Sequence, residues 1–225
     1  MSQAVYAKEM ADTITVEVFD ENGNAVSEVY TRSVRDYAMS TLAKNLSAKT
    51  NTLLVDMLNY GAAAQEFFGY NEADLANRRL TTVQKNMATK LQTCKDRREK
   101  GKNYYGSNLS LEDKILLNVY FENVTSDMYA KITYTDFRGR TQTITVPYRE
   151  FKHLTKNVYG VVVDDIVLGD SFCPIKVTVY NSKGKVYGSA TDSVESYCAR
   201  MNEDGSNALY NTIMQFAAGA KAYFS

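Results

Sequence analysis

Three cysteines and a single histidine are the residues of this chain most able to supply a nucleophile or a soft metal ligand. A catalytic thiol needs a nearby base, but no family-specific motif surrounds Cys94, Cys173 or Cys198, and His153 lies far from each in sequence. A tetrahedral zinc site would require all four residues. Cys198 falls on the apolar face of a predicted helix, where a free cysteine packs as a small hydrophobe. We therefore expect neither a thiol centre nor a bound metal, and a Cys173–Cys198 disulfide stays open.

Adjacent acidic residues are the next candidates for chemistry. Such pairs occur at Asp164-Asp165 and at Glu203-Asp204. Glycoside hydrolysis needs two carboxyl groups that face one cleft at about 5–10 Å, whereas neighbours on a strand point to opposite faces. The second pair lies in the turn sequence NEDG. Both pairs are interpreted as solvated charges.

Two further kinds of ligand site are disfavoured. The oxygen-rich segment Asp20–Asn24 lacks the spacing and terminal glutamate of an EF-hand, and its counterpart Asn181–Gly184 carries a lysine, so a hairpin turn is predicted in both places. Neither GxGxxG nor GxxxxGK[ST] occurs. We expect no cofactor, and we predict that the chain is not an enzyme.

The composition excludes several other classes. Lys+Arg and Asp+Glu both number 26, which argues against a general nucleic-acid binder. No apolar run reaches 18 residues, so no membrane insertion is expected. The opening MSQAVYAKEM has neither the basic start nor the apolar stretch of a signal peptide. A length of 225 residues predicts one or two domains.

The elements that would position any site are repeated along the chain. Each copy reads as strand, turn, strand, helix and helix, with Ser33 and Ser193 as predicted N-caps. The matched blocks occur in the same order in both copies: Ile14–Gly23 with Ile175–Gly184, Ser33–Ala38 with Ser193–Cys198, and Leu53–Phe68 with Leu209–Phe224.

Extra strands precede the second copy and have no counterpart before the first. They are predicted at Ile115–Phe121, Met128–Thr135, Thr141–Val146 and Gly160–Val167. The fold class is therefore predicted as α+β, with antiparallel sheet or sandwich-like units each followed by a helical hairpin, duplicated and with the first copy truncated. This gap suggests that the chain is part of a longer protein.

A basic segment, residues 78–102, joins the copies and holds nine basic and two acidic side chains. Apolar spacing predicts an amphipathic helix over about 81–93. The domain prediction is thus a first module at 1–77, a partly helical basic linker at 78–102 and a complete second module at 103–225.

The basic linker has three interpretations. It could face an acidic polymer or lipid, form an arginine-rich protein-binding surface, or serve as a solvated connector that pairs with acidic patches of its own modules. Dense charge beside paired aromatics makes Arg97, Arg98, Tyr104 and Tyr105 the predicted partner-binding residues. The chain has 17 tyrosines and no tryptophan, which weakens a sugar-binding hypothesis without removing it.

Several strings resemble a repeat module of large secreted or cell-wall-anchored surface proteins of gut Firmicutes (Lachnospiraceae and Clostridia). These are SVRDYA at 33–38, MLNYGAAAQ at 57–65, FGYN at 68–71 with LAN at 75–77, and NYYGSNL at 103–109. The resemblance implies an extracellular or wall-attached, non-catalytic, monomeric binding module. It further implies adhesion to a host protein, with an immunoglobulin variable domain, bound in the manner of a B-cell superantigen, as the specific candidate.

Binding is expected through an exposed sheet edge or helix face rather than a pocket. A glycan-binding or cell-wall-binding accessory module and a structural spacer stay open as alternatives.

Overall fold

A computed structural model describes residues 5–91, 93–111, 114–164 and 166–225. Helices and antiparallel strands form two compact units, Met1–Thr89 and Lys90–Ser225, which we call unit 1 and unit 2. The predicted α+β class is confirmed. The boundary between the units falls inside the segment predicted to be a linker, so residues 78–89 belong to unit 1 and residues 90–102 to unit 2.

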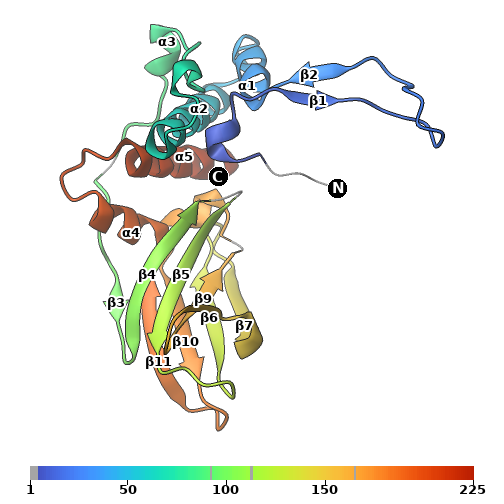
Figure 1. Cartoon of the computed structure of the whole chain (residues 1–225). Coiled ribbons are helices and arrows are strands. Elements are labelled where there is room, and N and C mark those ends of the chain that lie inside the picture. Colours follow the sequence, from blue (N-terminus) through green and yellow to red (C-terminus); the bar gives the residue numbers. More distant parts are fainter. Residues whose placement is uncertain (1–4, 92, 112–113, 165) are drawn as a thin grey trace. The chain divides into compact units, whose positions relative to one another are not determined.

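Unit 1 is a strand hairpin followed by helices (Figure 1). Ser33 caps the first helix by accepting the Asp36 N–H, and the Asp36 carboxylate accepts the Ser33 N–H in return. The long helix ends at Gly69, whose φ of 60° suits a residue without a Cβ. The elements are η1 (Ala7–Glu9), β1 (Ile14–Val16), β2 (Tyr30–Arg32), α1 (Val34–Leu42), α2 (Ala48–Phe68), η2 (Glu72–Asp74) and α3 (Thr82–Lys85).

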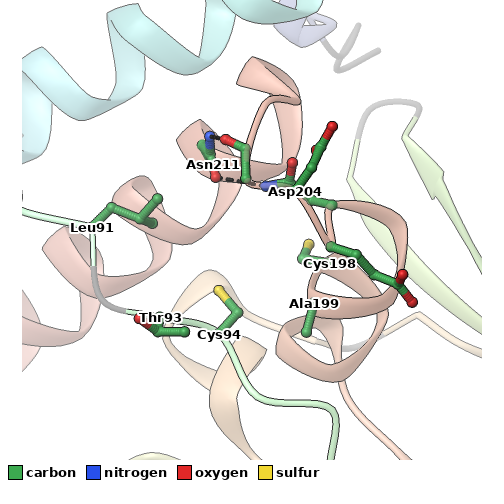
Figure 2. A pocket seen from close by; sticks show the side chains of 10 residues that line it. Leu91, Thr93, Cys94, Cys198, Ala199, Asp204 and Asn211 are labelled. Atoms are coloured by element: carbon green, nitrogen blue, oxygen red, sulfur yellow. Dashed lines mark hydrogen bonds between the residues drawn. The ribbon is translucent and has the colours of Figure 1, made fainter.

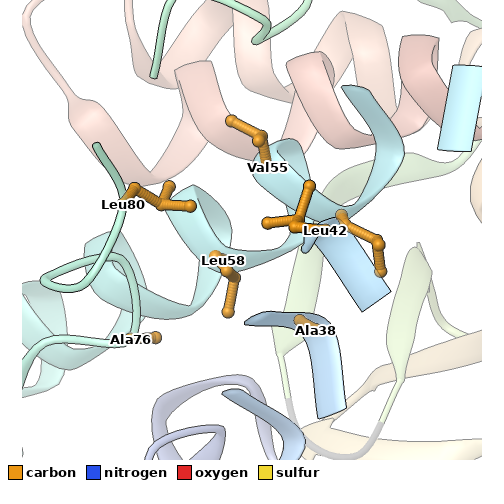
Figure 3. Packing of buried hydrophobic residues seen from close by; sticks show 7 residues of the cluster. Ala38, Leu42, Val55, Leu58, Ala76 and Leu80 are labelled. Carbon is orange, nitrogen blue, oxygen red and sulfur yellow. The ribbon is translucent and has the colours of Figure 1, made fainter. Parts of the chain in front are cut away.

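The core of unit 1 lies between α1, α2 and the segment after α2 (Figure 3). Its buried side chains are Ala38, Leu42, Leu54, Val55, Leu58, Ala76 and Leu80. Gly61 of α2 permits close approach of other segments, because a Cβ there would lie 2.8 Å from the Met10 sulfur and 3.1 Å from the Ala76 Cβ. A glycine at this position therefore lets α2 pack closely against the segment that begins at η1 and against the segment after α2.

The predicted amphipathic helix over 81–93 is wrong beyond its first turn, since α3 ends at Lys85. Tertiary hydrogen bonds hold the following residues in another conformation. The Met87 carbonyl accepts the Thr52 hydroxyl at 2.9 Å, and the buried Asp56 carboxylate accepts the N–H and hydroxyl of Thr89 at 2.9 and 2.6 Å.

Unit 2 contains two antiparallel sheets, one of five strands in the order β3-β11-β10-β6-β7 and one of four in the order β4-β5-β9-β8. The strands are β3 (Glu99–Lys100), β4 (Tyr104–Leu111), β5 (Ile115–Glu122), β6 (Tyr129–Thr135), β7 (Thr141–Pro147), β8 (Lys152–Thr155), β9 (Val158–Val163), β10 (Ile175–Tyr180) and β11 (Val186–Asp192). The other elements are η3 (Tyr148–Glu150), η4 (Leu168–Phe172), α4 (Val194–Met201) and α5 (Ala208–Phe224).

The apolar faces of the two sheets form the core of a sandwich. Apolar residues at every second position of β5 and β10 are fully buried: Leu117, Val119, Phe121, Ile175, Val177 and Val179. The intervening Asn118, Tyr120 and Thr178 are buried as well, on the opposite faces of these strands. A Cβ at Gly188 of β11 would lie 3.0 Å from the Phe121 ring, which shows how closely the sheets approach. The helices α4 and α5 contact each other and η4, and α4 also contacts β4.

One predicted strand is displaced in unit 2. Gly160–Val167 was expected, whereas β9 begins at Val158 and ends at Val163. The chain then enters η4, where the Asp170 carboxylate accepts the Phe137 N–H at 2.8 Å. The apolar residues after β9 therefore lead into a short helical turn.

Both units contain a strand hairpin followed by two helices, as β1-β2-α1-α2 and as β10-β11-α4-α5. Ser33 and Ser193 cap the first helix of each, as predicted. The hairpins differ in their neighbours. Strand β10 pairs with β11 on one edge and β6 on the other, while β1 pairs only with β2 among the described residues.

Candidate binding surfaces

The thiol and imidazole side chains do not form a reactive set. Cys94, Cys173 and Cys198 are all thiols, so no Cys173–Cys198 disulfide joins them. Burial raises the pKa of Cys173 to about 11 and raises the pKa values of Cys94 and Cys198. A thiol with a raised pKa is a poor nucleophile near neutral pH. His153 is exposed on β8, with its ring 5.0 Å from that of Tyr159.

The acidic candidates are turn residues. Glu203 and Asp204 are exposed between α4 and α5, and the N–H and hydroxyl of Ser206 lower the pKa of Asp204 by donating to it. Asp164 is exposed, and Asp165 lies outside the described residues. The described residues contain no group of three His, Cys, Asp or Glu side chains that could hold a metal ion.

The predicted hairpin turn after β1 is present. Asp20 accepts the N–H groups of Asn22 and Asn24 at 2.9 and 2.8 Å, and Gly23 has a φ of 83°. These contacts occupy the carboxylate in an Asx-type turn. Asn181 does the same in unit 2, where it accepts the N–H groups of Lys183 and Lys185.

A cavity of about 340 Å³ lies where the chain before β3 meets α4 and the α4–α5 turn (Figure 2). Cys94 and Cys198 line it, and Asn202 and Asn211 on its wall bind each other at 2.7 Å. The thiols have raised pKa values and the acidic lining residues belong to the solvated turn. None of the described lining thiols therefore has the lowered pKa of an activated nucleophile.

The four residues singled out in the sequence have separate roles. Arg97 is 57% exposed and lies 3.7 Å from Glu195, while the partly buried Arg98 lies 3.5 Å from Asp96. The Tyr104 hydroxyl is 3.1 Å from the Ser107 hydroxyl. Tyr105 is 53% exposed, at an irregularity in the β4–β5 pairing. The arginines therefore contact acidic side chains of their own unit.

Arg200 is a structural residue that sequence reasoning missed. Its guanidinium donates to Asp192 at 2.7 Å, to Asp96 at 2.9 Å and to Ser107 at 3.1 Å. The Asp192 carboxylate is fully buried and also accepts the Ser107 hydroxyl. This network connects α4 to β11, to β4 and to the segment before β3. No sequence motif marks it, because its members are distant along the chain.

The hairpin β1–β2 exposes a series of apolar side chains in unit 1. Ile14, Val16 and Tyr30 are 42%, 50% and 55% exposed. Together with Tyr37 of α1 they line an open groove of about 260 Å³. Further exposed apolar side chains continue along the hairpin: Val18, Phe19, Val26 and Val29. Figure 1 shows β1 and β2 extending side by side away from α1.

Unit 2 carries an aromatic cluster around β8 and β9. The Tyr148 ring lies 5.4 Å from that of Tyr159 and 5.9 Å from that of Phe151, and His153 completes the group. Tyr148 and Tyr159 are partly exposed. Such rings can stack on an apolar face of a ligand.

Among the described residues, no helix is both long and apolar enough to cross a membrane. No family model matches the chain, and neither does any curated protein.

Proposed function

We propose that this chain is a non-catalytic protein-interaction module and that the β1–β2 hairpin is its binding surface. The observation that carries the proposal is the exposure of Ile14, Val16 and Tyr30 on a strand pair whose outer edge has no partner among the described residues. Contiguous exposed apolar side chains mark interaction sites. An open sheet edge adds backbone donors and acceptors for a partner strand.

The resemblance of SVRDYA and the other strings to surface-protein modules supports a bacterial cell-surface or secreted setting. Within that setting the proposed partner is a host protein, and an immunoglobulin variable domain is the first to test. The protonated thiols and the solvated acidic turn support a binding role over catalysis.

The test is biolayer interferometry of the full chain against polyclonal IgA and IgG. Val16→Lys places a charge in the apolar surface, and we expect at least a tenfold loss of affinity. Val186→Lys is the matched control, because Val186 lies on the hairpin of unit 2 and is 62% exposed. It should bind as the parent chain does.

Two results would redirect the proposal. Binding that survives Val16→Lys but is lost on changing Arg97 and Arg98 to Glu would move the surface to the basic segment. Absence of binding at micromolar concentrations of both antibody classes would remove immunoglobulin as the partner.

A second candidate function is glycan or cell-wall binding, favoured by the cluster of Tyr148, Tyr159 and His153. A glycan array and a peptidoglycan pull-down would test it. Tyr159→Ala should abolish retention if these rings stack on sugar. Retention equal to that of the parent chain would exclude the cluster.

A further inference from the structure

The two hairpins correspond residue by residue along their first strands. Ile14, Val16 and Val18 of unit 1 match Ile175, Val177 and Val179 of unit 2 in the repeated sequence. Ile14 pairs with Arg32, the residue before the Ser33 cap, and Ile175 pairs with Asp192, the residue before the Ser193 cap. The second hairpin therefore shows what such a strand packs against inside a larger sheet.

In unit 2, the edge of β10 that faces away from β11 is paired with another strand. Strand β6 pairs antiparallel with β10, so that Val177 lies opposite Ile132, Thr178 opposite Lys131 and Val179 opposite Ala130. Buried residues alternate with Lys131 and Thr133 along β6. The apolar side chains of β10 are fully buried there, while those of β1 are exposed.

Strand β1 is suited to the same pairing. Glu17, the residue after β1, occupies the position of Thr178, so a lysine placed like Lys131 would lie directly opposite a carboxylate. Opposite charges across a strand pair are favourable. Phe19 occupies the position of Tyr180, whose ring stacks on Tyr129 with centroids 5.2 Å apart.

The backbone of β1 has donors available for that partner. The Val18 N–H donates to the Ser27 hydroxyl, and the Val18 carbonyl accepts the Val26 N–H, so this residue faces the β2 side. Because backbone groups alternate in direction along a strand, the amides of Thr15 and Glu17 point to the outer edge.

We propose that the outer edge of β1 accepts an antiparallel strand of the β6 type from a partner polypeptide, with apolar residues alternating with a lysine placed opposite Glu17. This inference rests on the proposed function and specifies its binding mode. A folded second copy is not the donor, because its own β6 is held between β10 and β7. Pairing of β1 with β1 of another copy is an alternative that the test distinguishes.

The probe is a synthetic peptide of residues 127–136, DMYAKITYTD, which contains β6. Titrated into the full chain by fluorescence anisotropy, it should bind saturably and with one-to-one stoichiometry. Hydrogen exchange should slow at the Thr15 and Glu17 amides. Val16→Lys should weaken binding at least tenfold, and Val186→Lys should leave it unchanged.

A charge exchange tests the register. Glu17→Lys should weaken binding of the unmodified peptide about two- to fivefold, in line with the interaction energy of cross-strand charge pairs. A peptide carrying Lys131→Glu should recover that loss against the Glu17→Lys chain. Loss without recovery would overturn the predicted register.

Two other outcomes would overturn the inference. Peptide binding that is indifferent to Val16→Lys would place the peptide elsewhere. The chain alone, at raised concentration, is the other case. If exchange of the same two amides then slows and light scattering gives a doubled mass, a second copy of the chain is the occupant. A third outcome separates the two proposals. If the peptide does not bind while antibody binding still depends on the hairpin, this binding mode is rejected and the proposed function stands.

Discussion

At the scale of single residues, two aspartates of unit 1 lie in opposite electrostatic settings. Asp56 is fully buried, and this burial raises its pKa despite the two hydrogen bonds from Thr89. Asp74 accepts the Arg35 guanidinium at 2.7 and 2.8 Å, and this interaction lowers its pKa. The two groups therefore couple folding to pH with opposite signs.

We predict that Asp56→Asn and Asp74→Asn change the pH dependence of unfolding in opposite ways. The ionised Asp56 is disfavoured in the folded state, so the contribution of Asp56 to folding stability falls as pH rises above about 3.8, and Asp56→Asn should gain stability relative to the parent chain over that rise. The stability that ionised Asp74 contributes to the fold is complete above about pH 3.8 and is lost as the pH falls below that value. The loss of unfolding free energy caused by Asp74→Asn should therefore become smaller in acid.

Urea unfolding of both variants and the parent chain, from about pH 3 to pH 7, measures these differences. Any change in packing that the substitutions cause adds an offset that does not depend on pH, so the slope of the free energy of unfolding with pH is the informative quantity. Slopes of the same sign would contradict the assignment of burial to Asp56 and of the arginine pair to Asp74.

At the scale of elements, the N-caps of α1 and α4 should each contribute measurably. Ser33→Ala and Ser193→Ala remove the side-chain acceptor for the first turn, and each should cost about 1 kcal/mol of unfolding free energy. Ser193 is buried and also donates to the Ser196 hydroxyl at 3.1 Å, so its loss should be the larger. Serine-to-threonine variants, which keep the hydroxyl, are the controls in thermal unfolding.

Elements were predictable where local pattern and tertiary packing agree. Alternating apolar residues located β5, β6 and β7, and serine caps located the starts of α1 and α4. The helix over 81–93 failed because the Asp56–Thr89 contact, which joins distant segments, outweighs the local apolar spacing. The Arg200 network and the aromatic cluster were invisible for the same reason.

At the scale of the whole molecule, each unit has its own buried core. Leu58 is fully buried in unit 1 and Phe121 in unit 2. We predict that Leu58→Ala costs about 2–5 kcal/mol and Phe121→Ala about 3–5 kcal/mol. Each variant should lower only one of two transitions in scanning calorimetry. A single transition shifted by both variants would contradict the division into units.

The sequence led to a prediction of the type of binding surface but not of the residues that form the candidate surface. The sequence indicated an exposed sheet edge or helix face as the binding element, and its first copy lacks the strands that precede the second. It placed the contact residues at Arg97, Arg98, Tyr104 and Tyr105, and those assignments stay predictions. Exposure of Ile14 and its neighbours depends on what surrounds the hairpin in three dimensions, which apolar spacing alone does not specify.

The open edge of β1 also has a consequence for how the protein behaves in storage. Natural edge strands are commonly guarded by lysine, proline or a bulge, which discourage fibrillar stacking. Between Ile14 and Phe19 the sole charge is Glu17, and proline is absent. Glu17→Gln would remove this charge, so concentrated samples of that variant should be the first to deposit cross-β aggregates.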